Sequence, residues 1–120
     1  MPEPKSQPDC IFCQIVAGKK PARIVYQDQE LTAFWDHYPA TPVHILIIPN
    51  QHIESMNKVD PSDSALLGRM MLKARDIAEE MGVRQKGYRL LINTERGGGQ
   101  SVFHLHLHLF AGDHLLAVHG

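Results

Sequence analysis

The chain has 120 residues, a length that suits one domain with its own hydrophobic core. Hydrophobic residues make up 43% and charged residues 21%, and the formal net charge of -1 gives no electrostatic reason to expect a nucleic acid or a membrane surface as a partner. No stretch approaches the roughly 20 apolar residues of a membrane span, and residues 1–5 lack the apolar core of a secretory signal. We therefore expect a soluble, cytoplasmic protein.

The first part of the chain divides into a tail and the start of a domain. Residues 1–9 contain three prolines and no apolar periodicity, so we expect a flexible tail there and a single domain over residues 10–120. The apolar segment 11–16 ends before Gly18 and Pro21, which predicts a short helix.

Five later segments have the composition of strands. Residues 24–26 and 31–36 flank a polar turn and predict a hairpin. Residues 43–48 are apolar at nearly every position and mostly β-branched, which indicates a central strand covered on both faces. Residues 87–93 predict a fourth strand and residues 102–110 the last one.

One long helix is predicted after Asp60, where the apolar period changes to 3.6 residues. Asp60 suits the N-cap, Pro61 the first helical position and Gly82 the left-handed residue beyond the end. No β-α-β unit repeats, so we expect an α+β fold, in which a five-stranded, mainly antiparallel sheet carries the long helix and a short N-terminal helix. The apolar stripe expected to face the sheet comprises Leu67, Met70, Met71, Ala74, Ile77, Ala78 and Met81.

Three histidines alternate with apolar residues in the last predicted strand. Because strand side chains point alternately to opposite faces, all three histidines should share one face. The other face is apolar and should pack against the helix stripe. The histidine face comprises His104, His106 and His108, and the apolar face Phe103, Leu105, Leu107 and Leu109.

Three interpretations fit this alternation. A merely solvated face would usually mix Lys, Glu, Thr and Ser instead. A catalytic zinc site with three histidine ligands is chemically reasonable, but same-face residues lie about 6.6 Å apart for each step of two, so His104 and His108 do not easily share an ion. Nucleophilic catalysis by one imidazole is favoured by the preceding loop 96–101, whose glycines expose backbone N–H groups that can hold an anion and whose Ser101 adds a hydroxyl donor.

Several motifs together resemble the histidine-triad family of nucleotide hydrolases and transferases, and specifically its Hint branch. The resemblance covers residue 9 to about 110 and implies a homodimer in which two five-stranded sheets join into one. It also implies hydrolysis of adenosine 5′-phosphoramidate and related purine nucleotides with P–N bonds. The motifs stand in the family's order at residues 9–13, 34–36, 44–49, 87–89, 98–103 and 104–110.

The same resemblance implies a role for each matching residue. His106 would attack the α-phosphorus and form a nucleotidyl-histidine intermediate, which water hydrolyses to release AMP. His108 would bind phosphate and handle the proton, while His44 and His104 would support the centre. The remaining implied contacts are Asn93, Gly99, Gln100 and Ser101 around the phosphate and leaving group, Asp36 for the ribose hydroxyls, and Phe12, Ile15 and Phe34 for the base.

Simpler structural roles remain open for several of these residues. Phe12, Ile15 and Phe34 could be ordinary core residues. Asp36 precedes a proline-rich segment and could form an Asx turn, and Asn93 could cap the end of a strand.

Two cysteines and two histidines form a further candidate site. A Cys-x-x-Cys pair in a reducing compartment is more often a metal ligand set or a redox pair than a structural disulfide. Some similar bacterial members of the family hold a structural zinc at these positions, whereas others keep the cysteines and bind no metal. The four residues are Cys10, Cys13, His52 and His104, and the alternative is two buried free thiols.

Taken together, these observations predict a purine nucleoside phosphoramidase that requires no cofactor for catalysis and has no nucleic-acid or membrane partner. A nucleotide-binding regulatory or scaffold module with incidental turnover needs the same contacts and is the alternative, and zinc-dependent hydrolysis by the triad is a third. Two departures from the family pattern bear on specificity. His37 replaces an expected aliphatic residue, which leaves the base preference open, and the tail 112–120 lacks the ending of animal members, which leaves the leaving group open.

Overall fold

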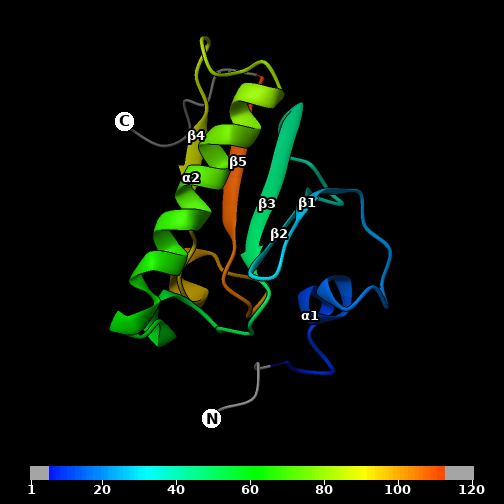
Figure 1. The fold of residues 1–120 in the computed structure, drawn as a ribbon, viewed down its shortest axis with the longest axis vertical. Coiled ribbons are helices and arrows are strands. Elements are labelled where there is room, and N and C mark those ends of the chain that lie inside the picture. Colours follow the sequence, from blue (N-terminus) through cyan, green and yellow to red (C-terminus); the bar gives the residue numbers. More distant parts are fainter. Residues whose placement is uncertain (1–5, 113–120) are drawn as a thin grey trace.

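The computed structural model describes residues 6–112, so the predicted tail lies partly, and segment 113–120 wholly, outside the described residues. One five-stranded antiparallel sheet forms the centre of the molecule, with the long helix on one face (Figure 1). The strand order is β1-β2-β3-β5-β4, which confirms the predicted α+β fold. The helices are α1 (Ile11–Val16) and α2 (Ser64–Glu80), and the strands are β1 (Ile24–Gln27), β2 (Leu31–Trp35), β3 (Val43–Pro49), β4 (Arg89–Leu91) and β5 (Leu107–Ala111).

The two faces of the sheet carry two separate apolar clusters. On one face, α2 packs its buried side chains against Leu105, Leu107 and Leu109 and against alternate residues of β3. On the opposite face, α1 packs Phe12 and Ile15 against the other alternate residues of β2 and β3. Strand β3 is buried at six of its seven positions because both faces are covered, as predicted for a central strand.

The last strand is shorter than predicted. β5 begins at Leu107, and residues 102–106 form no ladder. The reason is that their backbone groups bond elsewhere: the Leu105 N–H donates to the Ile53 carbonyl at 2.7 Å, and the Val102 carbonyl accepts from the Gln100 side chain at 3.0 Å. The alternation of faces nevertheless holds, since the three leucines enter the α2 cluster while His106 and His108 lie on the side of α1.

The start of α2 also differs from the prediction by one turn. Asp60 does cap, but it caps a 3-10 turn over Pro61–Asp63 and accepts from the Ser62 N–H at 2.8 Å. The α-helix proper begins at Ser64, and Gly82 takes the expected left-handed conformation with φ +74°.

The apolar stripe of α2 is rotated slightly from the predicted one. Met70, Ala74 and Ile77 are buried as expected, but Met71 is 47% exposed and Leu66, outside the predicted stripe, is buried. On the helical wheel the buried arc runs from Leu66 to Ala78, and Met71 lies just beyond the edge formed by Ala78. Met71 was therefore placed wrongly.

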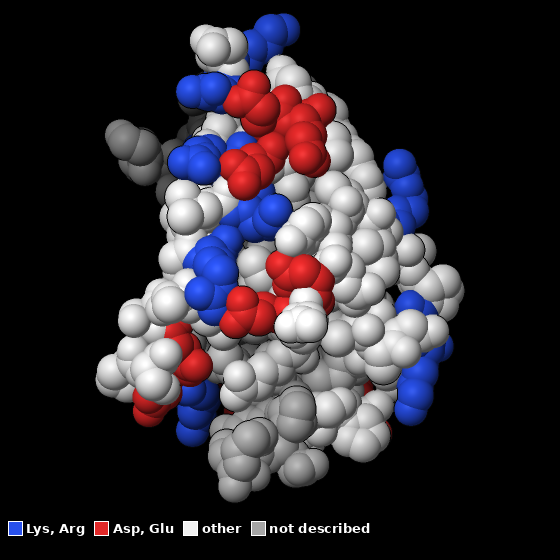
Figure 2. Space-filling model, in the orientation of Figure 1, with Lys and Arg blue, Asp and Glu red and all other residues white. Residues whose placement is uncertain are grey.

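The outer face of α2 is charged without one dominant sign (Figure 2). Exposed ion pairs join Arg69 to Glu30 and Arg84 to Glu79. Exposed pairs of this kind contribute little stability, but they interleave the two signs of charge over this face. Among the described residues, no helix is long and apolar enough to cross a membrane.

The two neighbouring methionines of α2 give a direct test of this packing. Replacing Met70, which is 1% exposed, by Ala should lower the free energy of unfolding by about 2–5 kcal/mol because it leaves a cavity in the core. Met71→Ala should change it by less than about 0.5 kcal/mol. Urea denaturation of both variants measures the difference, and similar losses in the two would contradict the observed phase of the helix.

Candidate active site

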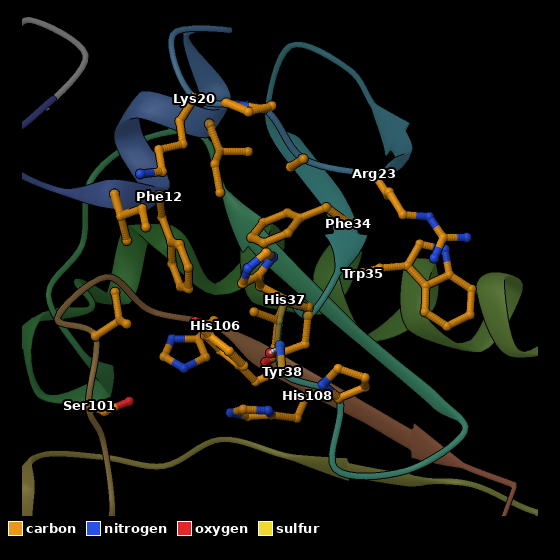
Figure 3. Close-up of a pocket in the computed structure, with 18 residues that line it drawn as sticks. Phe12, Lys20, Arg23, Phe34, Trp35, His37, Tyr38, Ser101, His106 and His108 are labelled. Carbon is orange, nitrogen blue, oxygen red and sulfur yellow. Dashed lines mark hydrogen bonds between the residues drawn. The ribbon is translucent and has the colours of Figure 1, made fainter.

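A cavity of about 800 Å³ opens on the α1 side of the sheet (Figure 3). Its walls come from α1, the segment before β1, the end of β2 and the stretch that leads into β5. Seven of the predicted site residues line it: Phe12, Ile15, Phe34, Asp36, Ser101, His106 and His108. His44 and His104 lie behind this wall, where they contact His108 and Phe12 respectively.

His106 is buried, and one hydrogen bond determines which of its nitrogens carries the proton. Its Nδ1 lies 2.6 Å from the His104 carbonyl oxygen. A carbonyl can only accept, so Nδ1 carries the hydrogen and Nε2 keeps a lone pair. Burial lowers the pKa of His106, although the His104 carbonyl and Asp36 oppose this shift. The ring is therefore a neutral imidazole of defined tautomer on the cavity wall, with the lone pair on Nε2.

A second chain of hydrogen bonds determines the tautomer of His108. The Ala40 N–H donates to His44 Nδ1 at 3.0 Å, which leaves the proton of neutral His44 on Nε2. That Nε2 lies 2.9 Å from His108 Nδ1, so His108 accepts there and carries its own proton on Nε2. Among the described residues, His108 Nε2 has no hydrogen-bond partner although it is buried. This series of hydrogen bonds thus leaves the Nε2–H of His108 as a donor beside His106.

Burial also keeps His108 neutral. Removal from water, together with the neighbouring His106 and His44, lowers the pKa of His108 to about 4. Burial likewise lowers the pKa of His44, against the opposing charge of Asp36. Both rings are therefore neutral near neutral pH.

Asp36 forms an Asx turn and lines the cavity at the same time. Its Oδ1 accepts from the Tyr38 N–H at 2.7 Å, and its own N–H donates to the His44 carbonyl at 2.9 Å. Its Oδ2 lies 3.4 Å from His44 Nε2. The Asx turn is therefore a structural role of Asp36, and it also holds the Asp36 carboxylate at the cavity.

The glycine-rich loop reaches the cavity through Ser101, which is exposed at its wall. Gly99 has φ +90°. A Cβ added at Gly99 would lie 3.8 Å from the side chain of Asn93. The Gln100 side chain does not line the cavity. Its Oε1 accepts from the Glu95 N–H, and its Nε2 donates to the carbonyls of Glu54 and Val102.

The apolar part of the cavity is also part of the protein core. The rings of Phe12 and Phe34 meet edge to face with centroids 5.4 Å apart, and Phe12 makes the same kind of contact with His106 at 5.2 Å. Both phenylalanines are buried. Core packing and cavity lining are here one function of the same side chains.

The mouth of the cavity contains residues that the sequence patterns missed. Lys20, Arg23, Trp35 and Tyr38 all line it, and the Arg23 guanidinium lies 4.9 Å from the Trp35 ring centroid. Tyr38 is 83% exposed and packs against His37 at 4.7 Å between ring centroids. The sequence signal that could have indicated this part of the cavity is the pair of adjacent aromatic side chains His37 and Tyr38, which stand between a strand and Pro39.

The Cys/His cluster (Cys10, Cys13, His52 and His104) assembles as predicted, with ligand atoms all within 4.8 Å of one another. Three sulfur–nitrogen separations are 3.3, 3.4 and 3.6 Å. A tetrahedral zinc with ordinary bond lengths would need about 3.6 Å between sulfur and nitrogen ligands. His104 donates from Nε2 to the Pro49 carbonyl at 2.8 Å, so its Nδ1 faces the two sulfurs with a lone pair. These residues therefore fit a metal ion.

The three triad histidines do not converge on one point. His104 turns toward the cysteines, His106 is tied to a carbonyl, and His108 pairs with His44. A second set of possible ligand atoms, from Asp36, His44 and His108, also lies within 4.8 Å. The geometry thus does not favour a zinc ion held by the triad itself.

Comparison with known proteins agrees with this architecture. Residues 9–118 match the family model described as "Scavenger mRNA decapping enzyme C-term binding". The purine nucleoside phosphoramidase of Escherichia coli K12 is 48% identical over 104 residues, which cover 87% of each chain.

Solved structures are similar over nearly the whole chain. A HIT family hydrolase from Legionella pneumophila has a TM-score of 0.89 at 42% identity, covering 91% of this chain and 97% of that one. A zinc-bound histidine triad family protein from Mycobacterium smegmatis has a TM-score of 0.77 at 30% identity, covering 91% and 78%. The likeness therefore extends to a member of this fold that holds zinc.

The low pKa of His108 predicts a stability that depends on pH. An unfolded histidine titrates near 6.5, whereas folded His108 titrates near 4, so between these values the unfolded chain binds more protons. The free energy of unfolding should therefore fall as the pH drops from about 6.5 to 4, by on the order of 2–3 kcal/mol for this group. Urea titrations of wild type and His108→Asn across this range measure it, and equal pH slopes in the two would contradict the assignment.

Proposed function

The chain belongs to the histidine-triad family, and from that premise we propose that it hydrolyses the P–N bond of purine nucleoside phosphoramidates through a covalent nucleotidyl-His106 intermediate. The observation that carries the proposal is the hydrogen bond from His106 Nδ1 to the His104 carbonyl, which leaves Nε2 as a nucleophile at the cavity wall. The named activity of the Escherichia coli relative supports the substrate class.

The cavity offers a suitable environment for each part of a nucleotide. A purine would lie in the apolar part formed by Phe12, Ile15 and Phe34, and the ribose hydroxyls would donate to Asp36. The α-phosphate would lie between Ser101 and His106, beside the glycine loop with Asn93, Gly99 and Gln100. Gln100 would act there only indirectly, because its side chain braces the loop and its backbone N–H donates to the Glu95 carbonyl.

The chemistry follows from the two tautomers. His106 Nε2 attacks the α-phosphorus, the P–N bond breaks, and the departing amine takes up a proton from solvent that His108 relays through its Nε2–H. Water then attacks the phosphorus, the bond to His106 breaks, and the proton lost by that water returns to solvent by the same route. The products are the nucleoside monophosphate and the amine. His44 supports this exchange because it holds His108 Nδ1 as an acceptor.

We propose that the protein acts as a homodimer. In the part of the chain that the structure describes, β4 stands at one end of the strand order β1-β2-β3-β5-β4, and its strand neighbour is β5. A second copy placed against the β4 edge would continue the sheet from one protomer into the next. This arrangement would also remove an edge strand, which proteins generally protect.

We also propose that the Cys/His cluster binds a structural zinc. Support comes from the sulfur–nitrogen separations and from the zinc-bound relative. A bound zinc would tie the start of α1, which carries Phe12, to the segment after β3 and to His104. The cluster would then stabilise the cavity wall without taking part in the reaction.

Turnover in the presence of a chelator tests the mechanism. Wild type should hydrolyse adenosine 5′-phosphoramidate with excess chelator present, and His106→Ala should lose at least about a thousandfold in kcat because the nucleophile is gone. Liquid chromatography of released AMP measures the rate.

Each other result of that assay has a defined meaning. Turnover abolished by the chelator would indicate metal-dependent hydrolysis and contradict the covalent histidine mechanism. An absence of turnover in wild type, together with retained AMP binding, would leave the regulatory or scaffold module. A full rate in His106→Ala would assign the nucleophile elsewhere.

The zinc site predicts a metal-dependent stability. Purified protein should contain about one zinc per chain, and removing it should lower the Tm by roughly 5 °C or more. Cys13→Ser should contain less zinc and show little further response to chelator. Elemental analysis and thermal denaturation measure both, and a zinc-free protein whose Tm ignores chelator would exclude the site.

A further inference from the structure

Glu95 has a backbone conformation that side chains rarely adopt. Its φ is 63° and its ψ is 172°, and it is the one non-glycine residue of the described chain with positive φ. Such conformations are costly and persist only where the surroundings hold them. The residue stands immediately before the glycine loop that leads to Ser101 and the histidines.

The Glu95 side chain is anchored to the segment that follows β3. Its Oε2 accepts from the hydroxyl of Ser55 at 2.6 Å and from the side-chain amide of Asn57 at 3.5 Å. Ser55 is fully buried, and its hydroxyl oxygen in turn accepts from the Asn57 N–H at 3.1 Å. The carboxylate is therefore attached to a fully buried hydroxyl in the segment that follows β3.

The Glu95 backbone is tied to the far end of the same loop. Its N–H donates to Gln100 Oε1 at 2.8 Å, and its carbonyl accepts from the N–H groups of Gly98 and Gln100 at 3.0 and 3.1 Å. Gln100 is 4% exposed and donates to the Glu54 carbonyl. The two ends of the loop are thus fastened to each other and to residues 54–57.

The middle of the loop is open around its glycines. A Cβ added at Gly97 or Gly98 would meet no atom within 4 Å beyond its chain neighbours. The N–H groups of Gly98, Gly99 and Gln100 donate within the loop, so Ser101 is the residue that the loop presents to the cavity, and its position depends on the hydrogen bonds at Glu95 and Gln100. Glycine would adopt the backbone conformation of residue 95 at a lower free-energy cost. What a glutamate adds at this position is therefore its anchored carboxylate.

We infer that Glu95 is a positioning residue, which holds the glycine loop in the geometry that binds the α-phosphate. This role rests on the proposed function for the identity of the substrate. It concerns how the loop is held, not which bond of the substrate breaks. The carboxylate does not line the cavity, and it acts on the anion only through the loop.

Binding of AMP compared with adenosine tests this role, because the two ligands differ only in the phosphate. Glu95→Gly should weaken AMP binding about tenfold or more and leave adenosine binding unchanged, since small displacements of oriented groups have large effects. Its Tm should stay close to that of wild type, because glycine relieves the strained backbone while the anchor is lost. Glu95→Gln should largely restore AMP binding, because its amide oxygen still accepts from Ser55.

Glu54→Gln is the matched control, because this neighbouring carboxylate is exposed and only its backbone carbonyl braces the loop. It should leave both affinities unchanged. An unchanged ratio of AMP to adenosine affinity in Glu95→Gly would overturn the inference, as would an equal loss for both ligands. Isothermal titration calorimetry gives these values without turnover, so a failure of the phosphoramidase proposal would appear separately, in the rate assay.

Discussion

The site depends on one short hydrogen bond, between the Nδ1–H of His106 and the carbonyl of His104, two residues earlier in the chain. Burial alone would make the imidazole neutral, but it would not select which nitrogen keeps the proton. The carbonyl makes that selection, and His104 is itself held because its ring donates to the Pro49 carbonyl. The orientation of the His106 ring therefore depends on how His104 is held.

His104 therefore has two separate roles in the structure. Its backbone serves His106, while its side chain belongs to the Cys/His cluster and contacts the Phe12 ring. Phe12 in turn packs against His106. Two short series of contacts thus join the cysteines to His106, one through the His104 backbone and the other through the Phe12 ring. The His104 side chain belongs to the Cys/His cluster, whereas its backbone carbonyl sets the tautomer of His106.

Alternation and composition were sufficient to predict the sheet, the hairpin, the central strand and the two faces around Leu105 and Leu107. They could not predict where β5 begins, because the Ile53 carbonyl that captures residue 105 is a backbone group with no sequence signature. The tautomer of His108 escaped for the same reason, since the Ala40 N–H selects it through His44. Glu95 was missed because positive φ is expected of glycine, and several glycines stood beside it.

The position of β5 in the sheet has a consequence for how the protein folds. This strand follows every other described element in the chain, yet it inserts between β3 and β4. Its pairing with β3 closes a loop of some sixty residues, and pairings between such distant segments form more slowly than local ones. His106 directly precedes this strand. A chain still emerging from the ribosome would therefore have synthesised α1, β2 and β3 before the segment that brings His106 and His108 to the cavity.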